Sequence, residues 1–143
     1  MMEDWKEGYQ VVISQEIHWG DMDAFQHVNN KVYFRFFEDA RLAFLQRINV
    51  MEFMQRSKIG PILASTSCDY RAPVLYPDTV HIASRVHDLQ AKRVSMDHLV
   101  FSEQQQKVVA DGTSLMVFYD FNSGKSTEIP TQIVEQIKAI QQE

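Results

Sequence analysis

Apolar residues follow two different periods along the chain. Between positions 11 and 19 they alternate with polar residues, which predicts a half-buried strand whose apolar side carries Val11, Ile13, Ile17 and Trp19. Between positions 30 and 47 they recur every three or four residues, as on one face of a helix. That stripe consists of Tyr33, Phe36, Phe37, Ala40 and Phe44. Because further apolar residues widen the stripe, we expect a central helix with other elements wrapped around it.

The narrow polar side of this helix carries charges of both signs. Arg35 and Asp39 stand four residues apart there. Side chains with this spacing are neighbours on a helix surface. We therefore expect these two to form an ion pair.

The second half of the chain returns to a period of two. Gly60-Pro61 is expected to break the chain after a short helical piece at 52–56. Pro130 then opens a final short helix. Between these helices, strands are predicted at 62–74, 79–89, 94–103 and 107–121. Consecutive strands with short links favour an antiparallel sheet. One sheet covers only one side of the central helix and leaves an edge unpaired, which favours a homodimer.

Length and composition exclude several classes of protein. Positions 1–143 are expected to form a single domain. A net charge of −5 argues against nonspecific binding to nucleic acid, and the single cysteine, Cys68, allows no internal disulfide. The charged N-terminus does not resemble a signal peptide, and no apolar run reaches the roughly 20 residues of a membrane span. We therefore expect a cytoplasmic protein that neither binds nucleic acid nor crosses a membrane.

A short polar turn with two acids and a histidine precedes the predicted helix. In the simplest interpretation Asp21 and Asp23 stabilise the turn, which spacing alone favours by roughly three to one. A second interpretation is a metal site of Asp21, Asp23 and His27 with further ligands from elsewhere. A calcium loop is excluded because its sixth position, a glycine, holds Gln26 here. In a third, free amides at the helix start polarise a carbonyl that Asp23 attacks, directly or through water.

The same stretch carries a family resemblance. From Trp19 the chain reads W-G-D-M-D-A-F-Q-H-V-N-N, followed by Y-x-x-x-F-E-x-A-R up to Arg41. This resembles the signature of the hotdog-fold acyl-CoA thioesterases, the 4-hydroxybenzoyl-CoA thioesterase-like superfamily. The R-A-P-V at 71–74 and the Ile129-Pro130 pair are also similar to that family. The resemblance implies an α+β hotdog fold, in which an antiparallel five-stranded sheet wraps a long central helix and a short C-terminal helix follows.

The resemblance also implies roles for individual residues. Asp23 falls at the catalytic carboxylate, as nucleophile or general base, and Asp21 at a position that shapes the turn. The helix-start amides near Asn30 would polarise the thioester carbonyl. Further residues implied to line the site are His27, Asn29, Asn30 and Tyr33. Lys92 and Arg93 would contact the phosphates of CoA.

The family further implies an assembly and a set of partners. Its sites form between subunits, so Asp23 and the basic pair of Lys92 and Arg93 would come from different chains of a homodimer or a dimer of dimers. The expected substrate is an acyl-CoA, with no metal and no cofactor beyond the CoA of the substrate. The hypothesis is therefore an acyl-CoA thioesterase. The alternative is a non-catalytic module that binds an acyl-CoA or acyl-carrier thioester.

Gln26 departs from the family pattern, which has glycine at this position. If that glycine serves a positive φ angle, Gln26 would be strained by about 1 kcal/mol or more. Either the turn differs here, or Gln26 contributes its side-chain amide to the site. Cys68 is expected to be a small buried apolar residue. Three other histidines are expected on the surface or as satisfied core residues: His81, His87 and His98.

Overall fold

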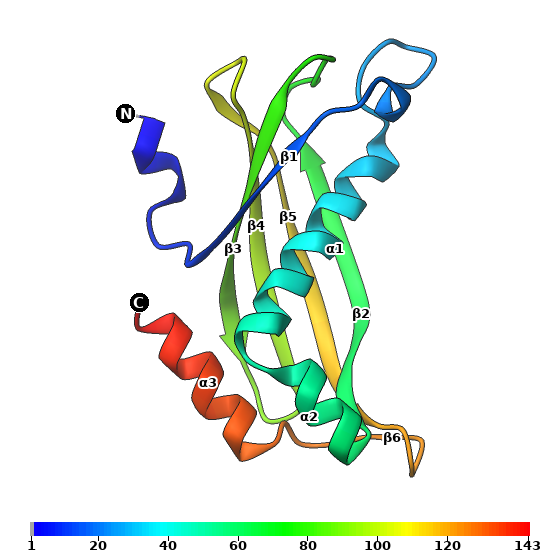
Figure 1. The fold of residues 1–143 in the computed structure, drawn as a ribbon, viewed down its shortest axis with the longest axis vertical. Helices are drawn as coiled ribbons and strands as arrows, with labels where there is room; N and C mark the ends of the chain where they lie inside the picture. The colour runs from blue at the N-terminus through cyan, green and yellow to red at the C-terminus, as the bar shows by residue number, and fades with distance from the viewer. Residues whose placement is uncertain (1) are drawn as a thin grey trace.

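The structure is a computed structural model and describes residues 2–143 (Figure 1). Two 3₁₀ turns, η1 and η2, span Met2–Lys6 and Trp19–Asp21. The helices are α1 at Asn30–Arg47, α2 at Val50–Ser57 and α3 at Thr131–Gln141. The strands are β1 at Val11–Glu16, β2 at Ile59–Tyr70, β3 at Thr79–Leu89, β4 at Arg93–Ser102, β5 at Lys107–Asp120 and β6 at Lys125–Ser126.

The strands form one antiparallel sheet in the order β1-β3-β4-β5-β2, and the two-residue β6 pairs with the end of β5. Helix α1 runs along one face of this curled sheet, while α2 and α3 lie at the end away from the start of α1 (Figure 1). β1 and β2 are the two edges. The predicted α+β hotdog architecture, with its long central helix and five main strands, is confirmed.

The apolar stripe of α1 is the centre of the core, as predicted. Phe36, Phe37, Ala40 and Phe44 are completely buried between the helix and the sheet. Gly112 of β5 lets the helix come this close, because a Cβ there would lie 2.4 Å from both the Phe37 ring and a β2 carbonyl oxygen. Among residues 2–143, no helix has the length and apolar character that would cross a membrane.

A buried polar chain links α1 to the sheet. Arg41 Nη1 donates to Ser114 Oγ at 3.0 Å, and His98 Nε2 lies 2.8 Å from that oxygen. The other ring nitrogen of His98 lies 2.6 Å from Ser84 Oγ. Burial, and then the nearby Arg41 charge, lower the pKa of His98 to about 3. His98 is therefore a neutral, satisfied core residue, one of the two environments that were predicted.

The other histidines and the cysteine have simpler surroundings. His87 lies on the surface beside Asp97, and His81 lies between Ser14 and Glu103. Cys68 is half-buried rather than buried, and its burial raises the pKa of the thiol to about 11. The thiol is therefore protonated at neutral pH and is a poor nucleophile.

The predicted break at Gly60-Pro61 is wrong, because both residues lie inside β2 and oppose Tyr119 and Phe118 of β5. β2 is an edge strand that pairs on one side only, so the missing N–H of Pro61 leaves no ladder bond unmade. β2 also ends at Tyr70, and residues 71–78 form a loop rather than the end of a strand.

Three smaller predictions also differ from the structure. The first strand ends at Glu16, and Trp19, expected on its buried side, is 76% exposed in η2. The helical piece before β2 is longer than the expected 52–56 and spans Val50–Ser57. Pro130 stands at the N-cap of α3, one residue before the helix begins.

Candidate functional site

Residues 20–28 fold into a tight turn above the start of α1. The Asp23 N–H donates to the His27 carbonyl at 2.9 Å, and the Gln26 N–H donates to the Asp23 carbonyl at 3.0 Å. Gln26 adopts a φ of +68°, the left-handed conformation that glycine tolerates best. The turn therefore has the geometry that a glycine would serve, and Gln26 adopts it at a cost of about 1 kcal/mol or more.

Asp21 is buried, and both of its carboxylate oxygens accept hydrogen bonds. Oδ2 accepts the His18 N–H at 2.9 Å, and Oδ1 accepts Arg35 Nη1 at 3.1 Å. Burial by itself would raise the pKa of Asp21, but the bonds from Arg35 and His18 hold that pKa below its usual range. The Asp21 carbonyl also accepts the Asn29 N–H at 2.9 Å. Asp21 thus ties the turn to the helix.

The predicted pairing of Arg35 with Asp39 is wrong. Arg35 reaches back to Asp21, and Asp39 instead accepts the side-chain amide of Gln15 in β1 at 2.5 Å. The reason is tertiary, since the folded turn offers Arg35 a buried carboxylate. A buried acid without a partner would be far more costly than an unpaired acid on the helix surface.

Asp23 has a different environment from Asp21. Its Oδ1 accepts the Phe25 N–H at 2.8 Å, while Oδ2 accepts no hydrogen bond from the described residues and lies 4.0 Å from His27 Nδ1. The side chain is 22% exposed and faces a pocket of about 570 Å³. The pocket is lined by Trp19, Gly20, Met22, Asp23, Gln26, Leu75 and Tyr76.

The start of α1 provides the second part of the site. The Asn29 side chain caps the helix by accepting the Lys31 N–H at 3.1 Å, and the Val32 N–H bonds the Asn29 carbonyl. The Asn30 N–H donates to none of residues 2–143. It carries the partial positive charge of a helix N-terminus and is available to a bound acceptor.

Two residues that the sequence assigned to the site have other surroundings. Tyr33 is 2% exposed and packs edge-on against Tyr70 with ring centroids 4.9 Å apart. Burial raises the pKa of its hydroxyl. His27 stacks on Phe25 at 6.4 Å and is partly exposed beside Asp23. Tyr33 is therefore a core residue in the first turn of α1. His27 lies next to Asp23 but does not line the pocket.

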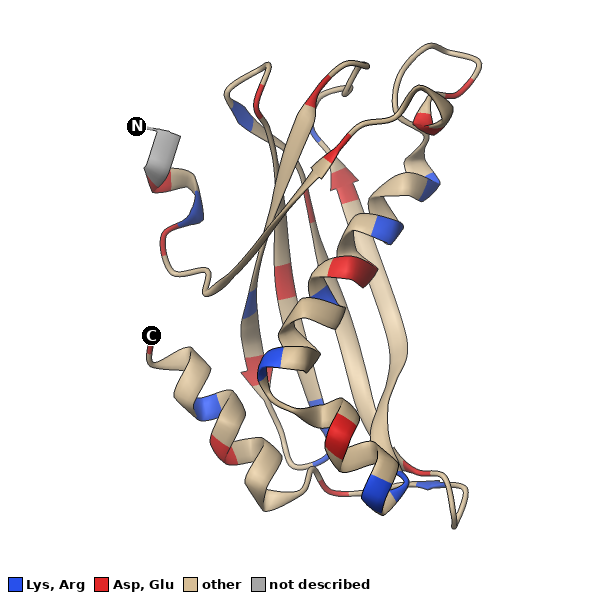
Figure 2. Ribbon diagram, in the orientation of Figure 1, with Lys and Arg blue, Asp and Glu red and all other residues tan. Residues whose placement is uncertain are grey.

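Lys92 and Arg93 lie at the other end of the molecule. Lys92 belongs to the connection between β3 and β4, Arg93 is the first residue of β4, and β3 alone, with 11 residues, spans roughly 35 Å. Figure 2 shows Lys and Arg residues at this end also on α2 and β6. The structure thus does not bring the basic pair close to Asp23 of the same chain.

The pocket wall opposite Asp23 was not predicted. Leu75 and Tyr76 come from the loop between β2 and β3, which falls between the predicted strands at 62–74 and 79–89. No regular spacing connects them to the Asp23 motif, about 50 residues earlier. Only the R-A-P-V resemblance at 71–74 pointed to this loop.

The described residues provide no ligand set for a metal ion in this turn. Across residues 2–143, no three His, Cys, Asp or Glu side chains are grouped so as to hold a metal ion. Asp21, Asp23 and His27 therefore do not form such a group. Asp21 is already bonded to Arg35 and to the His18 N–H.

Comparison with known proteins places this geometry in a family. A model of the thioesterase-like superfamily matches residues 17–137, which include the Asp23 turn, α1 and the whole sheet except β1. Long-chain acyl-CoA thioesterase FadM of Escherichia coli K12 is 26% identical over 117 residues, covering 82% of this chain and 89% of FadM.

Solved structures agree with this match. A thioesterase of Thermus thermophilus, complexed with coenzyme A and Zn, has a TM-score of 0.83 and 28% identity, covering 96% of this chain and 98% of its own. The PA5185 protein of Pseudomonas aeruginosa has a TM-score of 0.82 and 29% identity over 94% of each chain. The chain belongs to the thioesterase-like superfamily.

Proposed function

We propose that this protein hydrolyses acyl-CoA thioesters at Asp23. The observation that carries the proposal is the presence of two reactive groups where the Asp23 turn meets the start of α1. One is a carboxylate whose Oδ2 accepts no hydrogen bond from the described residues, and the other is the available Asn30 amide at the positive end of α1. Hydrolysis of a thioester needs a nucleophile or base together with a donor that stabilises the charge on the carbonyl oxygen.

The chemistry follows from these two groups. The thioester carbonyl oxygen accepts the Asn30 N–H, which stabilises the negative charge that develops there. Asp23 Oδ2 then either attacks the carbonyl carbon and forms an anhydride that water opens, or takes a proton from a water that attacks. In both routes the carbon–sulfur bond breaks and CoA leaves as a thiolate that takes up a proton. A thiolate leaves readily, so a strong general acid is not required.

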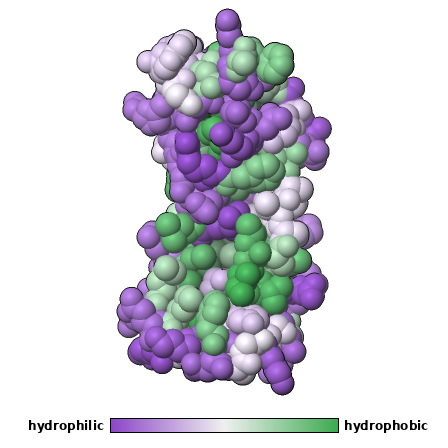
Figure 3. All heavy atoms as spheres, turned by 90° about the vertical axis from the view of Figure 1, so that its right-hand side faces the viewer, coloured by the Kyte–Doolittle hydropathy of each residue, from purple (hydrophilic) through white to green (hydrophobic). Residues whose placement is uncertain are grey.

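The second part of the proposal concerns assembly. β2 is an unpaired sheet edge, and apolar side chains around it are exposed, namely Phe34, Leu42, Met51, Ile62, Leu63 and Tyr70. Figure 3 shows apolar surface on this side, in two areas with a polar band between them. We propose that two copies pair here about a two-fold axis, because an unpaired apolar edge is a site for strand addition.

This arrangement would complete the site. An antiparallel partner runs in the opposite direction, so its β3–β4 connection approaches the end of the molecule where Asp23 lies. Lys92 and Arg93 of one subunit would then meet the CoA phosphates of a substrate held by Asp23 of the other. We further propose that two such dimers can pair into a tetramer.

Substrate class is proposed from the pocket and from the relatives. The exposed apolar side chains of Trp19, Leu75 and Tyr76 favour an apolar acyl group. FadM is described as a long-chain acyl-CoA thioesterase, and the Thermus protein binds coenzyme A. We propose the same carrier here, with no metal or cofactor besides the CoA of the substrate. A chelator is expected to leave the activity unchanged.

The test is release of free CoA thiol from a panel of acyl-CoAs of different chain length. Asp23→Asn should lower kcat by about 1,000-fold, because the amide is neither a base nor a nucleophile. Asp97→Asn, on the outer face of the sheet beside Arg85, is the matched control and should keep full activity. Equal rates for wild type and Asp23→Asn would refute the role of Asp23. Binding of acyl-CoA without turnover across the panel would favour the non-catalytic binding module instead.

A further inference from the structure

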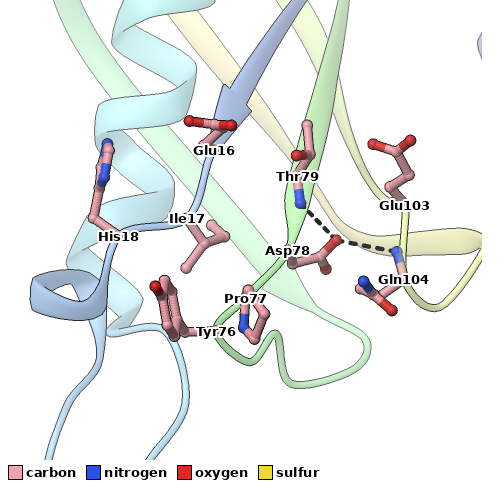
Figure 4. Close-up of a pocket in the computed structure, with 9 residues that line it drawn as sticks. All are labelled: Glu16, Ile17, His18, Tyr76, Pro77, Asp78, Thr79, Glu103 and Gln104. Carbon is pink, nitrogen blue, oxygen red and sulfur yellow. Dashed lines mark hydrogen bonds between the residues drawn. The ribbon is translucent and has the colours of Figure 1, made fainter.

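Asp78 is a buried carboxylate outside the proposed catalytic pair. It is 7% exposed. Its Oδ1 accepts the N–H groups of Thr79 at 2.7 Å and Gln104 at 3.0 Å, and its Oδ2 accepts the Ser102 hydroxyl at 2.5 Å. Figure 4 shows Asp78 between the start of β3 and the hairpin that follows β4. Three donors satisfy this buried charge without a cationic side chain among the described residues.

The backbone of Asp78 adds a third segment to this junction. Its carbonyl accepts the Ile17 N–H at 2.9 Å, just after the end of β1. Asp78 therefore joins the chain before η2, the loop between β2 and β3, and the β4–β5 hairpin. Removing a buried charged acceptor leaves several donors unsatisfied, so these segments are held together strongly.

The loop that ends at Asp78 carries one wall of the Asp23 pocket. Leu75 and Tyr76 line that pocket, and Tyr76 lies edge-on to Trp19 at 6.1 Å. The same loop is fastened to the Asp23 turn, because the Val28 N–H donates to the Val74 carbonyl at 2.8 Å. Asp78 thus fixes one end of the segment on which Leu75 and Tyr76 stand.

We propose that Asp78 is a positioning residue that holds Leu75 and Tyr76 as the wall against which the acyl part of the thioester binds. This inference rests on the proposed function for its substrate, but the positioning itself does not. Asp78 acts through Tyr76 and Leu75 and does not touch the reacting atoms. Its loss therefore affects substrate binding more than the chemical step.

Steady-state kinetics test this division between binding and chemistry. Asp78→Asn keeps the side-chain volume but replaces one acceptor by a donor that faces the Ser102 hydroxyl. It should raise KM by about tenfold, with kcat changed less than about twofold. Asp97→Asn is the matched control, since it also removes a carboxylate with several partners but lies on the outer face of the sheet. A fall in kcat at unchanged KM would overturn the proposal.

A double-mutant cycle separates positioning from a general loss of stability. Tyr76→Ala removes the wall side chain itself, so Asp78→Asn should add little to the KM of that variant. If the rise in KM of the double variant equals the product of the rises in the two single variants, Asp78 acts independently of the wall and the proposal is refuted. If Asp78→Asn does not fold, Ser102→Ala removes only one of the three donors and should give the same pattern with a smaller rise in KM.

Amide hydrogen exchange tests the positioning without any substrate. The Val28 N–H, bonded to Val74, reports whether the loop remains attached to the Asp23 turn. Asp78→Asn should speed its exchange by about tenfold, while Asp97→Asn should leave it unchanged. An unchanged rate in Asp78→Asn would refute the positioning role. Absence of thioesterase activity in the wild type would refute only the proposed function, because the exchange result does not depend on it.

Discussion

Asp21 and Asp23 lie in the same turn, two residues apart, yet their environments are opposite. Both oxygens of Asp21 accept hydrogen bonds, and the side chain is buried under Arg35. Asp23 lines a pocket, uses one oxygen to hold the turn, and leaves the other without a hydrogen bond from the described residues. The comparison shows how one residue type serves stability where its lone pairs are satisfied and becomes available for chemistry where one oxygen is left without a donor.

The largest effect expected from this comparison is on catalysis. Asp23→Asn should lose about 1,000-fold in kcat, equivalent to about 4 kcal/mol of transition-state stabilisation. Its free energy of unfolding should change by less than about 0.5 kcal/mol, since the amide oxygen still accepts the Phe25 N–H. Thiol release and urea denaturation measure the two quantities on one preparation. A large loss of stability would mean that Asp23 serves the fold as Asp21 does.

Asp21→Asn should show the reverse pattern. The amide cannot accept from both His18 and Arg35 while buried, so the free energy of unfolding at pH 7 should fall by about 2–3 kcal/mol. Urea denaturation of this variant beside Asp97→Asn measures the difference. If Asp21→Asn is as stable as wild type but inactive, Asp21 rather than Asp23 would be the reacting carboxylate.

The pH dependence of stability sharpens the same contrast. The folded-state pKa of Asp21 is lowered, so its stabilising contribution is present above the unfolded pKa of about 3.9 and is lost as pH falls through the folded value. The stability gap between wild type and Asp21→Asn should therefore be constant near neutral pH and shrink in acid, below about pH 4. Denaturation curves at pH 7, 5 and 3 measure it. A gap that widens in acid would contradict the assignment.

The smallest effect is expected at Gln26, which lies in the same turn as Asp21 and Asp23 and lines the Asp23 pocket. Gln26→Gly relieves a φ of +68° and should raise the free energy of unfolding by about 0.5 kcal/mol, less than the full strain because glycine is freer when unfolded. Gln106→Gly relieves a φ of +56° in the β4–β5 hairpin and is the matched control. Both should be stabilised alike, but only Gln26→Gly should change KM, because Gln26 lines the Asp23 pocket.

Much of the fold could be predicted because it depends on local periodicity. The apolar stripe of Phe36, Phe37 and Phe44 indicates a buried helix from the sequence alone, and in the structure these residues are buried in α1. Alternation located the strands. The prediction at Gly60-Pro61 was wrong because the effect of a proline depends on the place of its strand in the sheet. Gly60-Pro61 would break an interior strand but is tolerated in β2, which is an edge strand and pairs on one side only.

The site divides in the same way. The family resemblance of the motif from Trp19 to Arg41 assigned roles to Asp21, Asp23 and Asn30, whereas the spacing of the two acids alone favoured a turn. The partners of Arg35 and Asp78, and the wall of Leu75 and Tyr76, needed the tertiary structure. Each depends on segments that are distant in sequence and that meet only when the sheet closes around α1. A periodic pattern predicts which side of a helix or strand is buried, but it does not predict which groups of distant segments that side contacts.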